Sequence, residues 1–221
     1  MIELGPADLV DTPMAWPVVA TRTLGTGAIT TLRQDDVRTP DGDVIKREYL
    51  EHPGAVSVIV LDDQQRVGLV RQYRHPVRHR LIEPPAGLLD VRDEDPLVAV
   101  QRELAEEVGL TAGRWNVLVE LFTSPGILAE PMRIYLARDL SEVDAPDGFV
   151  RAGEEAHMDT VWAPLADLVD AVLAGRLHNP TLVSGVLAAW AAWQRDGFAT
   201  LRPGDVGWPA RDALLAATDL E

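Results

Sequence analysis

Three glutamates between positions 103 and 107 are the residues whose type and spacing most suggest chemistry. Glu106 and Glu107 follow Glu103 by three and four residues, which places all three on one face of a helix. Like charges at these spacings destabilise a helix by roughly 0.2–0.5 kcal/mol per pair. A hard divalent cation such as Mg²⁺ would offset this repulsion, because it prefers carboxylate oxygens and is held together with substrate phosphates. The spacing alone is equally compatible with a metal site and with a solvated acidic face.

The glutamates belong to a segment with the local signals of a helix over residues 96–108. Asp95 can cap its N-terminus, Pro96 suits the first helical position, and Gly109 provides a stop. Apolar residues at helical spacing form a stripe that can face a core: Leu97, Val100, Leu104 and Val108. The sequence therefore predicts a helix that buries one face and presents the glutamates on another.

The rest of the pattern predicts many strands and a few more helices. Residues 16–72 show β-type runs separated by turn residues, and strand-like runs follow at 115–122 and 132–137. Helical patterns occupy residues 165–173, 179–193 and 210–217. Because strands and helices do not alternate regularly, the expected class is α+β.

Composition excludes several functions. Acidic side chains outnumber basic ones by 35 to 20, which gives a formal net charge of -15. We expect neither nucleic acid nor a membrane as partner, because binding to these polyanionic surfaces rests on basic side chains. The absence of cysteine rules out disulfides and thiolate chemistry. With no basic leader and no apolar run long enough to cross a bilayer, we expect a cytoplasmic protein.

The string from Gly87 to Leu110, GLLDVRDEDPLVAVQRELAEEVGL, resembles the Nudix box. The glycine and the first glutamate of the box correspond to Gly87 and Glu94, which are separated by one residue more than in the box. The part of the box that begins with Arg-Glu corresponds to residues 102–110. The resemblance implies a Nudix fold, an α/β/α sandwich with a mixed β-sheet. It also implies an enzyme that cleaves a nucleoside diphosphate linked to another moiety.

The resemblance further implies roles for individual residues of the box. Glu103 and Glu107 would be the main ligands of Mg²⁺, for which Mn²⁺ could substitute. Glu106 would assist both the metal and catalysis, and Arg102 would orient the glutamates. The backbone oxygen of Ala86 would complete the metal shell.

Flanking segments resemble the ADP-ribose pyrophosphatase branch of the family. The matching stretches are residues 47–56, 72–76, 83–87 and 123–126. The resemblance implies substrate contacts from Arg47, Glu48 and Arg74, and sugar-end contacts from Gly126 and Glu130. Arginine suits phosphate binding because its fork can bind two oxygens at once. Without the resemblance, surface salt bridges and an ordinary turn glycine would be the commoner interpretations.

In the branch, a loop late in the domain supplies the general base, and residues Gly153–Met158 resemble that loop. The register favours Glu155 as the base, and Glu154 is the alternative. The interpretation without a catalytic role is that both are acidic residues of an exposed loop. One departure concerns the sugar end, because Ala129 stands where the branch usually has an acid. A different ADP- or GDP-sugar is therefore an alternative substrate.

The expected organisation has three parts. Residues 1–52 would form a β-rich segment, antiparallel and used in dimerisation, residues 53–197 the Nudix domain, and residues 198–221 a C-terminal tail. The branch implies a homodimer that hydrolyses a small nucleotide sugar, ADP-ribose, to AMP and ribose 5-phosphate. A module that only senses ADP-ribose is the alternative from another class, but such a module could dispense with the three glutamates.

Overall fold

Two units share the chain in an interleaved way. The computed structural model describes residues 3–91, 93–144 and 158–218. The larger unit takes residues 53–123 and 130–206, and the smaller unit takes residues 1–52, 124–129 and 207–221. Each unit is described separately below.

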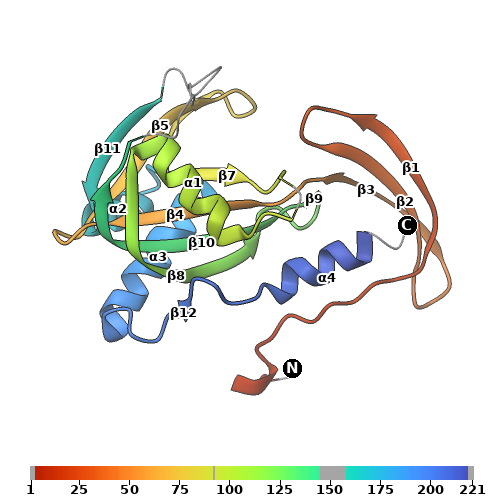
Figure 1. Cartoon of the computed structure of the whole chain (residues 1–221). Coiled ribbons are helices and arrows are strands. Elements are labelled where there is room, and N and C mark those ends of the chain that lie inside the picture. Colours follow the sequence, from red (N-terminus) through yellow and green to blue (C-terminus); the bar gives the residue numbers. More distant parts are fainter. Residues whose placement is uncertain (1–2, 92, 145–157, 219–221) are drawn as a thin grey trace. The chain divides into compact units, whose positions relative to one another are not determined.

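A mixed sheet forms the centre of the larger unit (Figure 1). Its strands lie in the order β11 (Asp159–Pro164), β5 (Arg66–Arg74), β4 (Ala55–Leu61), β10 (Pro131–Glu142), β8 (Leu110–Phe122) and β12 (Arg202–Pro203). The central pair, β4 and β10, is parallel, and the other neighbours on this path are antiparallel. Two short strands complete the sheet, because β6 (His79–Glu83) pairs with β5 and β7 (Ala86–Leu88) pairs with β4.

Helices cover both faces of this sheet. Every residue of β4 is buried, and successive side chains of a strand point to opposite faces. Ile59 packs in the main core with buried residues of α2 (Leu165–Leu173) and α3 (Pro180–Asp196). On the other face lies α1 (Pro96–Val108), which contacts β4, β5, β7 and β8 and adds nothing to that core cluster. The predicted α+β class is confirmed, and the layers are those of an α/β/α sandwich.

Local signals set the ends of α1. The Asp95 side chain accepts a hydrogen bond from the Leu97 backbone N–H at 2.7 Å, and Gly109 ends the helix with φ +69. Only a residue that tolerates the left-handed region suits this stop. The predicted bounds, residues 96–108, are those observed.

Two predicted strands are longer than their local patterns suggested. β8 begins at Leu110 and β10 continues to Glu142, and these two residues are partners at the end of the ladder. Pairing with a neighbour therefore extends both strands beyond the runs predicted at 115–122 and 132–137. Within the described residues, no helix is long and apolar enough to span a bilayer.

The smaller unit contains a four-stranded sheet. β1 (Val18–Thr26), β2 (Thr31–Arg38) and β3 (Val44–Glu51) pair antiparallel in sequence order, and β9 (Leu128–Ala129) joins β3 in parallel. A 3-10 turn, η1 (Pro6–Asp8), and a helix, α4 (Pro209–Thr218), also belong to this unit. β1 is an edge strand, and it exposes Val18, Val19 and Leu24.

Candidate active site

Arg102 lies at the centre of an acidic cluster on α1. Its Nη1 donates to Glu103 Oε1 at 2.7 Å and to Glu106 Oε2 at 3.3 Å, while Nε and Nη2 contact the two oxygens of Glu94 at 3.3 and 3.2 Å. These carboxylates hold the pKa of Arg102 above its ordinary value, with the hydrogen bond to Glu94 as the largest cause. One guanidinium thus faces three carboxylates, so the cluster retains net negative charge.

Glu107 ties the same helix to β7. Its side chain is buried, and Oε2 accepts a hydrogen bond from the Ala86 backbone N–H at 3.1 Å. Ala86 is held in place by pairing with Ser57 of β4. The backbone of β7 therefore fixes one carboxylate oxygen of Glu107. The metal-ligand role of the Ala86 backbone oxygen remains a prediction.

Gly87 makes room for Glu103. A Cβ added at Gly87 would lie 2.2 Å from the Cδ and Oε1 atoms of the Glu103 carboxylate, a distance that real Cβ contacts do not reach. The backbone of β7 therefore approaches this carboxylate as closely as glycine alone permits. This close approach gives a steric reason for the glycine that precedes the helix.

The donor set fits a hard divalent cation. The carboxylates of Glu103, Glu106 and Glu107 supply oxygen ligands, and the backbone of Gly87 lies directly against the first of them. No three acidic or histidine side chains in the described ranges already surround a common metal position. Instead, Arg102 contacts Glu103 and Glu106. The cation would therefore bind among carboxylates that also contact an arginine.

A second arginine is held by a buried carboxylate. Arg74 Nε contacts both oxygens of Glu83 at 3.1 and 3.2 Å, and Nη2 contacts Oε2 at 2.7 Å. The Gln72 amide donates to the same oxygen at 3.0 Å. Sequence reasoning selected Arg74, but it included Glu83 only in a matching stretch and gave it no role. Only the register of β5 against β6 reveals it, because a glutamate ending a strand is usually exposed.

Comparison with known proteins decides the family. Residues 51–182 match the model of the NUDIX domain. The chain belongs to the Nudix family. It is 45% identical to an ADP-ribose pyrophosphatase of Mycobacterium tuberculosis, over 92% of this chain and 96% of that protein. It is 33% identical to a methanol dehydrogenase activator of Bacillus methanolicus, over 76% of this chain and 89% of that protein.

The fold is also found in a solved structure. A protein described as an ADP compounds hydrolase matches with a TM-score of 0.69 and 22% identity, over 85% of this chain and 99% of that one. At this identity the likeness supports the fold. The NUDIX model, the pyrophosphatase relative and the solved structure together confirm the predicted Nudix family, the Nudix fold and the enzyme class, a hydrolase.

The remaining predicted site residues of this Nudix chain are distributed over both units. In the larger unit, Glu130 accepts a hydrogen bond from the Thr123 hydroxyl. In the smaller unit, Arg47 donates to the Lys46 backbone oxygen at 2.8 Å, and the Glu48 carboxylate accepts from Gln34 at 2.7 Å.

Two predictions concern loops. A Cβ added at Gly126 would meet no atom within 4 Å, so the described contacts give no steric need for glycine there. The predicted base, Glu155, and its alternative, Glu154, lie outside the described residues. The roles of Gly126 and of both glutamates stay predictions.

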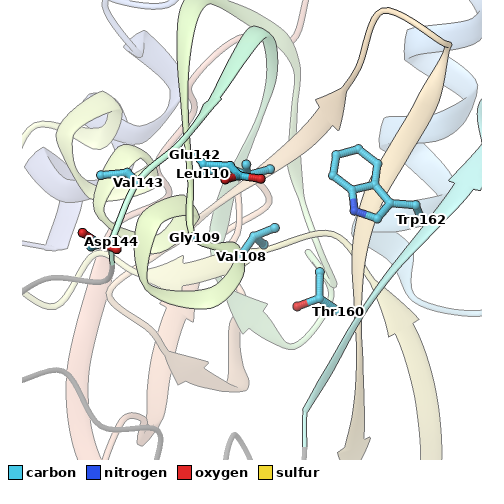
Figure 2. Close-up of a pocket in the computed structure, with 8 residues that line it drawn as sticks. All are labelled: Val108, Gly109, Leu110, Glu142, Val143, Asp144, Thr160 and Trp162. Carbon is cyan, nitrogen blue, oxygen red and sulfur yellow. The ribbon is translucent and has the colours of Figure 1, made fainter.

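A cleft of about 660 Å³ opens where α1 ends, next to the Nudix glutamates in sequence but lined by other residues (Figure 2). Its described walls are Val108, Gly109, Leu110, Glu142, Val143, Asp144, Thr160 and Trp162. No predicted metal ligand is among them. Glu142 and Asp144 give the walls negative charge, which disfavours a diphosphate.

Proposed function

We propose that this Nudix protein hydrolyses the diphosphate of ADP-ribose to AMP and ribose 5-phosphate, with Mg²⁺ as cofactor and Mn²⁺ as a substitute. The observation that carries the substrate is the 45% identity, over almost the whole of both chains, to a protein named ADP-ribose pyrophosphatase. The net negative charge around Arg102 supports a cation at this site.

The Nudix carboxylates have distinct roles in this proposal. Glu103 and Glu107 hold the metal, and Glu106 assists both the metal and catalysis. Once bound, the cation would neutralise the diphosphate and make water a better nucleophile. Arg102 orients Glu103 and Glu106 through its two Nη1 contacts. Glu155, or alternatively Glu154, accepts the proton of the attacking water.

The proposal also assigns substrate contacts to individual residues. Arg74 binds phosphate oxygens, which its guanidinium can reach because 43% of its side chain is exposed. Arg47 and Glu48 contact the nucleotide, and Gly126 and Glu130 contact the terminal sugar.

We also propose that the protein is a cytoplasmic homodimer. The exposed edge strand β1 supports the dimer, because an unpaired edge offers backbone groups to a second strand and its Val18, Val19 and Leu24 side chains offer apolar surface. Cytoplasmic localisation follows from the expected substrate, since nucleotide sugars are charged metabolites. Light scattering at several concentrations would measure the mass in solution.

Another nucleotide sugar is the alternative substrate. Ala129 stands where the branch usually has an acid, directly before Glu130. Loss of that carboxylate would alter hydrogen bonds to the terminal sugar while leaving the diphosphate chemistry unchanged.

The test is hydrolysis of a substrate panel with Mg²⁺: ADP-ribose, ADP-glucose, GDP-mannose and NADH. Wild type is compared with Glu107→Gln and with a control, Asp139→Asn, which removes an exposed carboxylate paired with Arg114. We expect AMP release from ADP-ribose to exceed all others, to be lost in Glu107→Gln and to persist in the control. Faster hydrolysis of GDP-mannose or ADP-glucose would show that the substrate is another nucleotide sugar. Binding of ADP-ribose without turnover of any compound would favour a sensor.

A further inference from the structure

The ion pair between Arg74 and Glu83 differs from other pairs on the same hairpin. Only 2% of the Glu83 side chain is exposed, against 43% for Arg74. Arg71 and Arg80, on the same two strands, both contact Asp159, whose side chain is 48% exposed. Pairs between exposed partners contribute little to stability. A carboxylate removed from water is costly unless its oxygens are fully hydrogen-bonded.

The surroundings of Glu83 meet that requirement. Its oxygens accept three hydrogen bonds from Arg74 and one from Gln72, whose side chain is also buried. Val70 is the cross-strand partner of Glu83, so Gln72 and Arg74 follow on the same face of β5 and reach Glu83 diagonally. Contacts through both Nε and Nη2 fix the plane of the guanidinium. A buried acceptor thus orients a solvent-exposed donor.

The position of Glu83 links this pair to the carboxylate cluster. Glu83 precedes Ala86 by three residues, and the Ala86 N–H holds Glu107. Three residues of extended chain span at most roughly 11 Å. The Arg74 pair and the Nudix carboxylates are therefore close enough to act on one nucleoside diphosphate.

We propose that Glu83 is a positioning residue, which holds Arg74 in the orientation that binds the diphosphate of the substrate. This role rests on the proposed function. Stability alone is a poor explanation for the buried charge, because well-packed apolar residues stabilise such positions equally well. Glu83 acts through Arg74 and needs no contact with the substrate itself.

The experiment measures steady-state hydrolysis of ADP-ribose by Glu83→Gln, which keeps the length of the side chain but loses its charge. We expect KM to rise about tenfold, the weight of one charge-assisted hydrogen bond, with kcat within about twofold of wild type. The matched control is Glu120→Gln, which removes the charge facing a different arginine, the buried Arg133. It should lower the melting temperature and leave KM unchanged.

A double variant tests whether Glu83 acts through the arginine. Arg74→Ala should raise KM at least as much as Glu83→Gln. Adding Glu83→Gln to Arg74→Ala should raise KM no further, because the group that Glu83 orients is already absent. If Glu83→Gln does not fold, Gln72→Met provides the test, with an expected rise in KM of about threefold from the loss of one neutral hydrogen bond.

The outcomes separate the two proposals. An active wild type with unchanged KM in Glu83→Gln, or in Gln72→Met where that variant is needed, overturns the positioning role alone. An equal rise in KM in Glu120→Gln, or additive effects in the double variant, also overturns it. A wild type that does not hydrolyse ADP-ribose overturns the proposed function, and the positioning role in that reaction with it.

Discussion

Two arginine–glutamate networks in the larger unit have opposite charge balances. Around Arg102, one guanidinium faces three carboxylates. Around Glu120, one carboxylate faces two guanidinium groups, Arg133 and Arg202. The first network has an excess of negative charge and the second an excess of positive charge.

Arg102 and Arg133 also differ in their access to solvent. One third of the Arg102 side chain is exposed, at 33%, whereas only 3% of Arg133 is exposed. Arg133 also donates to the Val206 backbone oxygen at 2.8 Å, so its charge is closed off by partners within the protein. We infer that an arginine–glutamate network favours a cation where the carboxylates outnumber the arginines. Where the arginines outnumber the carboxylate, as around Glu120, the network joins neighbouring strands.

The largest expected effect is loss of activity in Glu103→Gln. Removing one metal-binding carboxylate should lower kcat about 10³-fold, since a catalytic metal contributes several kcal/mol to the transition state and each 1.4 kcal/mol is tenfold. The free energy of unfolding should stay unchanged or rise slightly, because repulsion among the carboxylates falls. AMP release and urea unfolding measure the two quantities. Full activity in this variant would contradict the assignment of metal binding to the network around Arg102.

The second network should respond in the opposite way. Glu120→Ala leaves the buried Arg133 charge without its carboxylate, so the free energy of unfolding should fall by about 3–5 kcal/mol. Activity per folded molecule should remain within about twofold of wild type, because the network lies outside the candidate site. Urea unfolding and active-site titration test this prediction. An unchanged unfolding midpoint would contradict the structural role assigned to Arg133.

Metal should stabilise the folded protein through the first network only. At a free Mg²⁺ concentration of 100 times Kd, wild type should gain about 2.7 kcal/mol. Glu103→Gln should lose most of this gain, and Glu120→Gln should retain it. Melting temperatures with Mg²⁺, with EDTA and with Na⁺ at matched ionic strength measure the effect. An equal gain in both variants would place the cation elsewhere.

The smallest effect should come from the cap of the helix that carries the first network. Asp95→Ala removes the side-chain acceptor for the Leu97 N–H and should cost about 1 kcal/mol of unfolding free energy. Asn179→Ala, which removes the same type of cap from α3, is the matched control. Both should lose similar stability, but only Asp95→Ala should lower kcat/KM, by about two- to threefold, through a shift of α1. Equal kcat/KM values would show that the cap does not position the glutamates.

The sequence by itself determined the helix that carries the glutamates. Asp95, Pro96 and Gly109 act on backbone groups within a few residues, and the observed cap and left-handed stop are those expected. The start of α2 at Leu165 and its end at Leu173 were also predicted from local pattern. The spacing of the glutamates placed them on one helical face in the same way. Interactions of this kind need no information from distant parts of the chain.

Tertiary structure alone decided the partners of the buried charges. Glu120 meets Arg202 across 82 positions of sequence, and Ala86 meets Glu107 across 21. The pairing of β6 with β5 places Glu83 beside Gln72 and Arg74. The parallel pairing of β10 with β4 is a second arrangement of this kind. Such pairings depend on which strands become neighbours, and no residue within one strand encodes that choice. A glutamate in sequence therefore shows its charge, and only the fold shows whether a cation, an arginine or water will face it.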